Sequence, residues 1–119
     1  MWAMQLQKIY REKRPWGEFV EYAKNTPCTV KIITVNPNEA TSLQRHSLRD
    51  EFWHIISGSG LITIGTDKIE ARIGNDHYIP RETNHRLEAG ESFLVVLEIS
   101  TGQFHENDIE RLDDRYNRK

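Results

Sequence analysis

The sequence is poor in cysteine and contains no long apolar run. Its one cysteine, Cys28, cannot close a disulfide within the chain, and structural disulfides belong mainly to oxidising compartments. No stretch resembles a secretion signal or the ~20 apolar residues of a membrane helix. We therefore expect no membrane partner and a reducing, cytoplasmic location. Cys28 lies among valines and isoleucines, which predicts a buried, inert thiol rather than a reactive one.

An excess of one charge is also missing. The chain has 16 basic and 18 acidic residues, with both signs interspersed. Proteins that bind nucleic acids or anionic membrane surfaces concentrate positive charge on one surface, which this composition does not provide. A nucleic-acid partner is therefore not expected.

Helical periodicity is scarce, and short segments rich in β-branched residues take its place. They recur between turn residues as EFVEYA, TVKIITV, EFWHIIS, GLITIGT, KIEARI and FLVVLEI. Many short strands predict an all-β closed barrel or double-sheet jelly roll, because both protect strand edges. The 119 residues suit one domain. We predict an arm at about 1–15, a barrel at about 16–100, and a tail at about 101–119 that holds a short helix or is frayed.

Two local features of this β pattern add detail. The segment KIYREKR, residues 8–14, alternates basic and apolar types. It predicts an edge strand or arm that a second subunit would exchange, which favours a homodimer. Gly65, Thr66 and Asp67 separate two strand-like runs and predict a hairpin turn.

Residue types that bind metals gather after residue 43. Side chains alternate faces along a strand, so Gln44 and His46 project to one side, and Glu51 opens a second run after a turn. His85 follows in a second polar stretch, GNDHYIPRETNHRLEAG. Two imidazoles, a carboxylate and an amide oxygen, completed by solvent, suit Zn²⁺, Mn²⁺, Fe²⁺, Co²⁺ or Ni²⁺. The alternative is that these are ordinary polar residues near the surface.

The residues around this cluster resemble the two motifs of the cupin superfamily. The first, G-x5-H-x-H-x4-E-x6-G, matches residues 38–58, and the second, G-x5-P-x-G-x2-H-x3-N, matches residues 74–89. The resemblance implies one divalent metal ion held by four side chains: Gln44, His46, Glu51 and His85. Three positions where glycine or asparagine is usual depart from the motifs: Asn38, Glu82 and Ala89.

Within the cupins, the sequence is similar to type II phosphomannose isomerase domains, best known as the C-terminal part of bifunctional mannose-1-phosphate guanylyltransferases. The similarity lies in RPWGEF, VKIITVNP, SLQRHSLRDEFWHIISG, YIPRETNHRL and NDIERLDDRYNR. It implies a single cupin-type double-stranded β-helix, or jelly-roll barrel. It also implies a metal-dependent isomerase, with zinc as the first choice of metal, that interconverts mannose 6-phosphate and fructose 6-phosphate.

This reaction moves a proton between C1 and C2 of the sugar and needs a base whose pKa lies near the working pH. Lys31 would be that catalytic base if its strand points it into the barrel; otherwise it is an exposed lysine. The resemblance points to Arg111 as the catalytic clamp for the phosphate, with Arg49 and Arg86 as further substrate-binding candidates. Trp53 could stack on the sugar ring, although large aromatic residues more often fill a core.

Two other functions stay open at the level of sequence. One is a non-catalytic cupin that binds a sugar or sugar nucleotide, and the other is a metal-dependent dioxygenase. The fold cannot choose among them, because one barrel hosts many chemistries. Gln44 in place of a third imidazole gives a harder metal shell, which favours Lewis-acid chemistry over oxygen activation.

Overall fold

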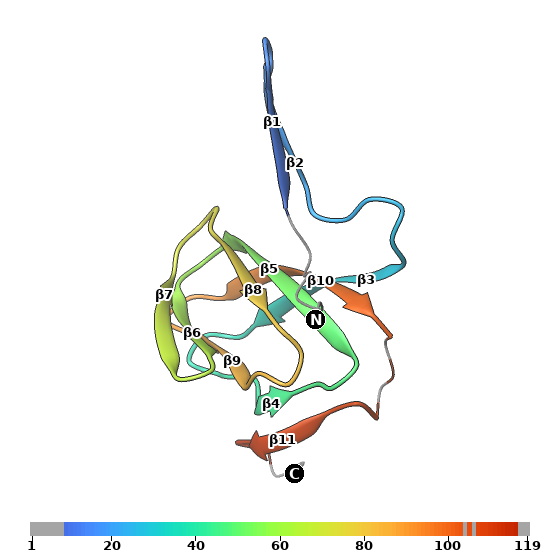
Figure 1. Cartoon of the computed structure of the whole chain (residues 1–119). Helices are drawn as coiled ribbons and strands as arrows, with labels where there is room; N and C mark the ends of the chain where they lie inside the picture. The colour runs from blue at the N-terminus through green and yellow to red at the C-terminus, as the bar shows by residue number, and fades with distance from the viewer. Residues whose placement is uncertain (1–8, 104, 106, 117–119) are drawn as a thin grey trace.

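The computed structural model describes residues 9–103, 105 and 107–116. All regular elements in this part of the chain are β-strands, paired antiparallel (Figure 1). Their bounds are β1 Tyr10–Arg14, β2 Gly17–Glu21, β3 Cys28–Val35, β4 Leu43–Arg45, β5 Arg49–Ser57, β6 Gly60–Ile64, β7 Asp67–Ala71, β8 Asp76–Ile79, β9 His85–Ala89, β10 Leu94–Gly102 and β11 Glu110–Asp113. The described residues include no helix long and apolar enough to cross a membrane.

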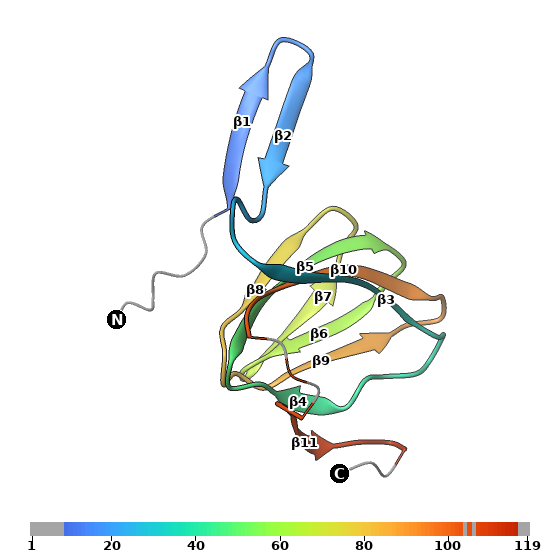
Figure 2. The same ribbon diagram turned by 90° about the vertical axis from the view of Figure 1, so that its right-hand side faces the viewer.

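Two sheets form the body of the molecule. One has the strand order β3-β10-β5-β8, and the other has the order β11-β4-β9-β6-β7. From β3 onward the chain passes back and forth between these sheets, which wraps it into a jelly-roll barrel (Figures 1 and 2). The all-β jelly-roll prediction is confirmed. The predicted short helix in the tail does not occur among the described residues, because residues 110–113 pair with β4 as strand β11.

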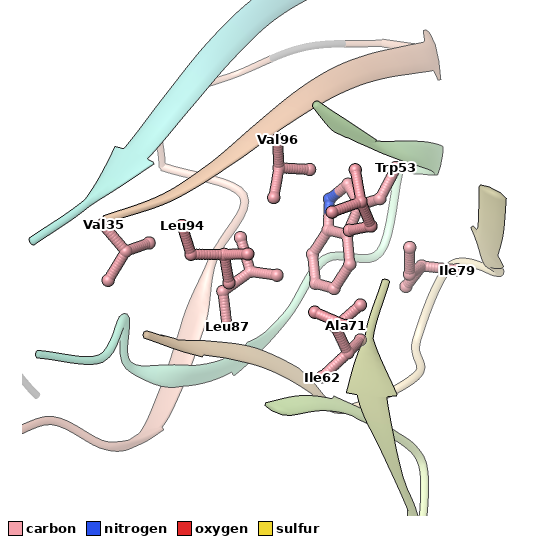
Figure 3. Close-up of a cluster of buried hydrophobic side chains, with 9 residues drawn as sticks. Val35, Trp53, Ile62, Ala71, Ile79, Leu87, Leu94 and Val96 are labelled. Atoms are coloured by element: carbon pink, nitrogen blue, oxygen red, sulfur yellow. The ribbon is translucent and has the colours of Figure 1, made fainter. Parts of the chain in front are cut away.

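The core lies between the two sheets and follows from alternation along the strands. Leu94 and Val96 point inward from β10, and Trp53 and Ile55 do so from β5. The other sheet adds Ile62 and Leu87, so that both inner faces pack together (Figure 3). Trp53, which we considered for sugar stacking, is 2% exposed and belongs to this core. Burying side chains of this size stabilises the fold by about 1.5–3 kcal/mol each.

Two turns explain departures from the cupin motifs. Asn38 and Glu82 stand where the motifs have glycine, and both adopt a left-handed backbone, with φ of 64° and 63°. Both residues thus take a conformation that glycine adopts without strain. For a residue such as Glu82 this conformation costs about 1–2 kcal/mol. A 2.6 Å hydrogen bond from the Glu82 amide to the His46 carbonyl oxygen helps to hold the turn and joins the two motifs.

Other local predictions had different outcomes. The turn at Gly65 joins β6 and β7, so the predicted hairpin is confirmed. Cys28 was predicted to be buried, and this is wrong: the thiol is exposed at the start of β3. β3 is an edge strand, so apolar neighbours in the sequence do not guarantee cover on its outer face.

Strands β1 and β2 form a separate two-stranded hairpin at the N-terminal side of the barrel. In both ribbon views it stands clear of the two sheets (Figures 1 and 2). The molecule accordingly measures 48 Å along its longest axis and 23 Å along its shortest. Within the described residues, 9–14 of the segment KIYREKR therefore form part of a projecting arm.

Candidate metal centre

A buried group of two histidines and one glutamate lies at one end of the core. β5 supplies Glu51, β9 begins with His85, and His46 directly follows β4. Glu51 Oε2 lies 3.5 Å from His46 Nε2, and Glu51 Oε1 lies 3.8 Å from His85 Nε2. All three side chains are buried, and their ligand atoms fall within 4.8 Å of one another. This group could hold a metal ion.

Gln44 joins the same group through strand pairing. It is the register partner of His85 across β4 and β9, so both side chains project from the same face of the sheet. Both residues line the cavity that opens onto the group. The four predicted ligands are therefore brought together.

Backbone contacts orient both imidazole rings. His46 Nδ1 lies 2.6 Å from the carbonyl oxygen of Asp108, and His85 Nδ1 lies 2.9 Å from that of Thr83. A carbonyl oxygen only accepts, so each Nδ1 carries the hydrogen and donates. Each Nε2 then keeps its lone pair and lies 3.5 Å (His46) or 3.8 Å (His85) from an oxygen of Glu51. This is the arrangement by which proteins orient histidines that bind metals.

Burial also sets the charge of these rings. Desolvation lowers the pKa of His85 from 6.5 to about 4, against a smaller opposing effect of the Thr83 carbonyl. Desolvation likewise lowers the pKa of His46. Both rings are neutral at pH 7, as metal ligands must be.

One carboxylate oxygen of Glu51 is placed where a cation could bind it. Its Oε1 is buried and has no hydrogen-bond partner within the described residues. Buried carboxylate oxygens are nearly always paired, so a lone one calls for an explanation. A divalent ion between Glu51 and the two Nε2 atoms supplies the missing contact, and the donor set therefore fits a metal.

The Arg49 side chain contacts two atoms of the same group. Its guanidinium lies 3.0 Å from His46 Nε2 and 3.1 Å from Glu51 Oε2. The side chain is buried, so its positive charge compensates the Glu51 carboxylate. A metal ion bound to these atoms would have to displace Arg49 toward the cavity.

A cavity of about 220 Å³ opens above the group. Seven of the predicted residues line it: Lys31, Gln44, His46, Arg49, Trp53, His85 and Arg111. Arg86 lies elsewhere, because its guanidinium binds the Thr41 carbonyl oxygen and the Asp113 side chain. A second cavity of about 370 Å³ shares Gln44 and Arg111 with the first and extends to Tyr116.

Glu98 lines the first cavity and was not among the predicted residues. It projects inward from β10 between Lys31 on β3 and Trp53 on β5, its two register partners. Trp53 Nε1 donates a 3.2 Å hydrogen bond to Glu98 Oε2. Burial, and then the nearby Glu51 carboxylate, raise the pKa of Glu98 from 4.5 to about 7. Alternation in LVVLE, which puts Glu98 on the same side as Leu94 and Val96, was the signal that could have found it.

The opposite pKa shifts of His85 and Glu98 predict how stability depends on pH. The His85 pKa is lowered in the folded state, so the stability that neutral His85 contributes is lost as the pH falls from 6.5 toward 4. The Glu98 pKa is raised in the folded state, so the stability that protonated Glu98 contributes is present below pH 4.5 and lost as the pH rises toward 7. Between pH 4.5 and 6.5 the two effects oppose each other.

Metal-free Glu98→Gln should therefore lose about 3 kcal/mol more stability than the wild type between pH 6.5 and 4.5. His85→Gln removes the effect of His85, so over the same pH range it should lose less stability than the wild type. Urea unfolding with a chelator, at several pH values, measures both. Identical pH profiles for the two variants and the wild type would contradict this account.

Solved structures place this fold among the cupins. A cupin protein from Bacteroides fragilis aligns with a TM-score of 0.60 at 24% identity, covering 70% of this chain and 75% of that one. The capsular polysaccharide assembling protein CapF from Staphylococcus aureus aligns with a TM-score of 0.63 at 19% identity, covering 89% of this chain and 33% of that one. The chain thus has the cupin barrel fold, with a buried group suited to metal.

Sequence comparison narrows the class to one family. The sequence profile described as "Mannose-6-phosphate isomerase C-terminal" matches residues 3–114. The chain belongs to this family. Its relatives include the xanthan biosynthesis protein XanB of Xanthomonas campestris, 35% identical over 94% of this chain. Another is the alginate biosynthesis protein AlgA of Pseudomonas aeruginosa, 36% identical over 88% of this chain. The chain spans only 24% and 22% of the length of these two relatives.

Proposed function

We propose that this chain is a metal-dependent sugar-phosphate isomerase that interconverts mannose 6-phosphate and fructose 6-phosphate. The observation that carries the proposal is the buried His46–Glu51–His85 group at the floor of a cavity, in a chain of the mannose-6-phosphate isomerase C-terminal family. The exposed thiol of Cys28 suits a reducing compartment, so we assign the activity to the cytoplasm.

The donor atoms favour zinc as the metal. Two imidazole nitrogens and one carboxylate are a common catalytic zinc set, to which Gln44 would add an amide oxygen. Mn²⁺, Co²⁺, Ni²⁺ and Fe²⁺ accept the same atoms. When bound, the ion would act as a Lewis acid on the sugar oxygens without changing its redox state.

The residues around the cavity suit proton transfer between C1 and C2. Glu98 has a pKa of about 7, which is the range in which a general base works best at neutral pH. We assign the proton transfer to Glu98, with the hydrogen bond from Trp53 Nε1 fixing its orientation. Lys31, its neighbour on β3, is then better suited to stabilise the negative oxygen that develops on the sugar than to act as the base.

Arg111 is the side chain best suited to the phosphate. Its Nε is buried and has no hydrogen-bond partner within the part of the chain that the structure describes. It lines both cavities, so a phosphate there could lie in one cavity while the sugar reaches the metal group in the other. Arg49, once displaced from Glu51, would add a second guanidinium to the same space.

The test is a coupled isomerase assay on the metal-loaded protein, repeated after treatment with a chelator. We expect turnover only with metal, and Arg111→Ala should raise KM for the phosphorylated sugar about 10–100-fold, since a hydrogen bond to a charged group contributes roughly 1.5–3 kcal/mol. Metal content should not change. Arg86→Ala is the matched control, because Arg86 is an arginine of the same sheet that lies outside the cavity.

One observation favours the non-catalytic alternative. Arg49 contacts two of the atoms that a metal would use, Glu51 Oε2 and His46 Nε2, so part of the group is paired without an ion. A non-catalytic cupin would bind mannose 6-phosphate with no turnover in the presence of any of the five metals. That result would overturn the isomerase proposal.

A further inference from the structure

Of the four predicted metal ligands, His46 is the one that a loop carries. The other three stand in β4, β5 and β9. His46 belongs to residues 46–48, which link β4 to β5. A strand is held by its pairing with neighbouring strands, whereas a ligand on a loop needs other contacts to keep its geometry. The contacts that fix residues 46–48 therefore bear directly on the metal centre.

Asp108, in the segment between β10 and β11, binds this loop at three points. Its carboxylate oxygens accept hydrogen bonds from the backbone amides of Ser47 and Leu48, each 2.9 Å long. Its carbonyl oxygen accepts the 2.6 Å hydrogen bond from His46 Nδ1. Hydrogen bonds to a charged carboxylate are stronger than those between neutral groups. One residue thus fixes both the backbone of the loop and the direction of the imidazole ring.

The neighbouring backbone is also held from distant segments. The amide of Gln103 donates a 3.0 Å hydrogen bond to the Leu48 carbonyl oxygen, and the Glu82 amide donates to that of His46. β4, which leads into the loop, has only three residues. A single register pair joins it to β9, whereas three join it to β11. The ligand-bearing strand therefore has more pairing with the tail than with the rest of the barrel.

The tail that supplies Asp108 continues into β11, which lies along β4 (Figures 1 and 2). Arg111 of β11 is the register partner of Gln44 and lines the cavity above the metal group. The position of the tail accordingly affects two parts of the site, the loop that carries His46 and the arginine suited to the phosphate.

We propose that Asp108 is a positioning residue for the metal centre, and that metal binding and docking of the tail stabilise each other through it. The inference rests on the metal centre of the proposed function but not on turnover. A metal held at His46 Nε2 would keep the ring in the orientation in which Nδ1 donates to Asp108. The docked tail in turn keeps the ring in the orientation that the metal needs. Coupling between two equilibria is reciprocal, so each should strengthen the other.

Titration of the metal-free protein with Co²⁺, followed by the visible absorption of the bound ion, measures the effect on the metal. Asp108→Ala should raise the dissociation constant about 10–100-fold, as other changes to groups that orient a metal ligand do. The Co²⁺ spectrum of Asp108→Ala should shift toward that of His46→Ala, because both substitutions weaken the same metal bond. Asp108→Asn keeps one acceptor for two amides, so its dissociation constant should lie between those of Asp108→Ala and the wild type. Circular dichroism of the metal-free variants should match that of the wild type.

Glu110→Ala is the matched control, because Glu110 is an acidic residue of the same tail that also contacts the β4 strand. It pairs with Arg45, but the two side chains are 55% and 42% exposed. Exposed ion pairs contribute little, so the dissociation constant for Co²⁺ should stay within about 5-fold of the wild-type value. An equal loss of affinity in Glu110→Ala and Asp108→Ala would overturn the role assigned to Asp108.

Hydrogen exchange measures the effect of the metal on the tail. Zn²⁺ should slow amide exchange in residues 107–113 of the wild type, and the slowing should be smaller in Asp108→Ala at saturating Zn²⁺. β7, at the opposite edge of the same sheet, is the internal reference and should not respond.

Unchanged Co²⁺ affinity in Asp108→Ala and Asp108→Asn, or tail exchange in the wild type that does not respond to Zn²⁺, would overturn the proposal. A wild type that binds no Co²⁺ would overturn both this inference and the proposed function. A wild type that gives the expected binding and exchange results but no isomerase turnover would contradict only the proposed function.

Discussion

His85→Ala should lose the bound metal. The substitution removes one of the two imidazoles proposed as ligands, whose Nε2 atoms lie near Glu51, and the Thr83 carbonyl that orients the ring cannot replace it. Changes to groups that merely orient a ligand cost about 10–100-fold in metal affinity. Loss of the ligand itself should weaken binding by at least about 100-fold. Elemental analysis after dialysis against a weak chelator measures the occupancy.

Thermal unfolding provides a second reading of the same prediction. A metal at about 100 times its dissociation constant stabilises a folded protein by about 2.7 kcal/mol. Wild type should therefore melt higher with zinc than with chelator, whereas His85→Ala should melt at the same temperature in both. His54→Ala is the control, because His54 lies on the opposite face of β5 from Glu51 and contacts Asp76. Full metal occupancy in His85→Ala would show that these residues are not the ligands.

Glu98→Gln should abolish most turnover while leaving the site otherwise intact. Glutamine has the same shape and still accepts the hydrogen bond from Trp53 Nε1, but it cannot take a proton from the sugar. Loss of a general base costs about 10²–10⁴-fold in rate. The fall should appear in kcat, with KM and metal content close to those of the wild type.

Two variants make this result specific. Glu98→Asp keeps the carboxylate but draws it back from the cavity, so it should recover part of the lost kcat. Glu91→Gln, at an exposed position before β10, should behave as wild type. If Glu98→Gln keeps full kcat, the proton transfer belongs to another group, and Lys31→Met would then be the variant to assay.

The residues of the candidate metal centre were accessible from the sequence because their spacing resembles the cupin motifs. Gln44, His46 and Glu51 follow the cupin spacing, and the structure places them around one point with His85. Glu98 was missed because a lone glutamate in an apolar strand looks like an outward-facing residue until the face of the strand is known. Its partner strands, β3 and β5, show that this face is the inner one.

Arg86 and Arg111 are two further residues whose surroundings only the structure shows. The resemblance pointed to Arg111 for the phosphate and kept Arg86 as a further candidate, but their local sequence alone does not show which of them reaches a substrate. The pairing of β11 with β4 brings Arg111 opposite Gln44 at the cavity, whereas Arg86 is engaged by Asp113 and the Thr41 carbonyl. A contact between residues so distant in the chain depends on how the sheets are assembled, which local residue patterns do not record.

The alternation of apolar residues and the placement of turn residues were sufficient to predict short strands and a closed barrel or jelly roll, since these follow from local preferences and from a pattern of period two. The resemblance to the cupin motifs added the family. Strand order decided the rest: that Glu98 reaches the cavity and Arg86 does not, that Arg49 lies against Glu51, and that β3 is an edge with an exposed thiol. Burial and neighbouring charge belong to the assembled sheets rather than to any single segment.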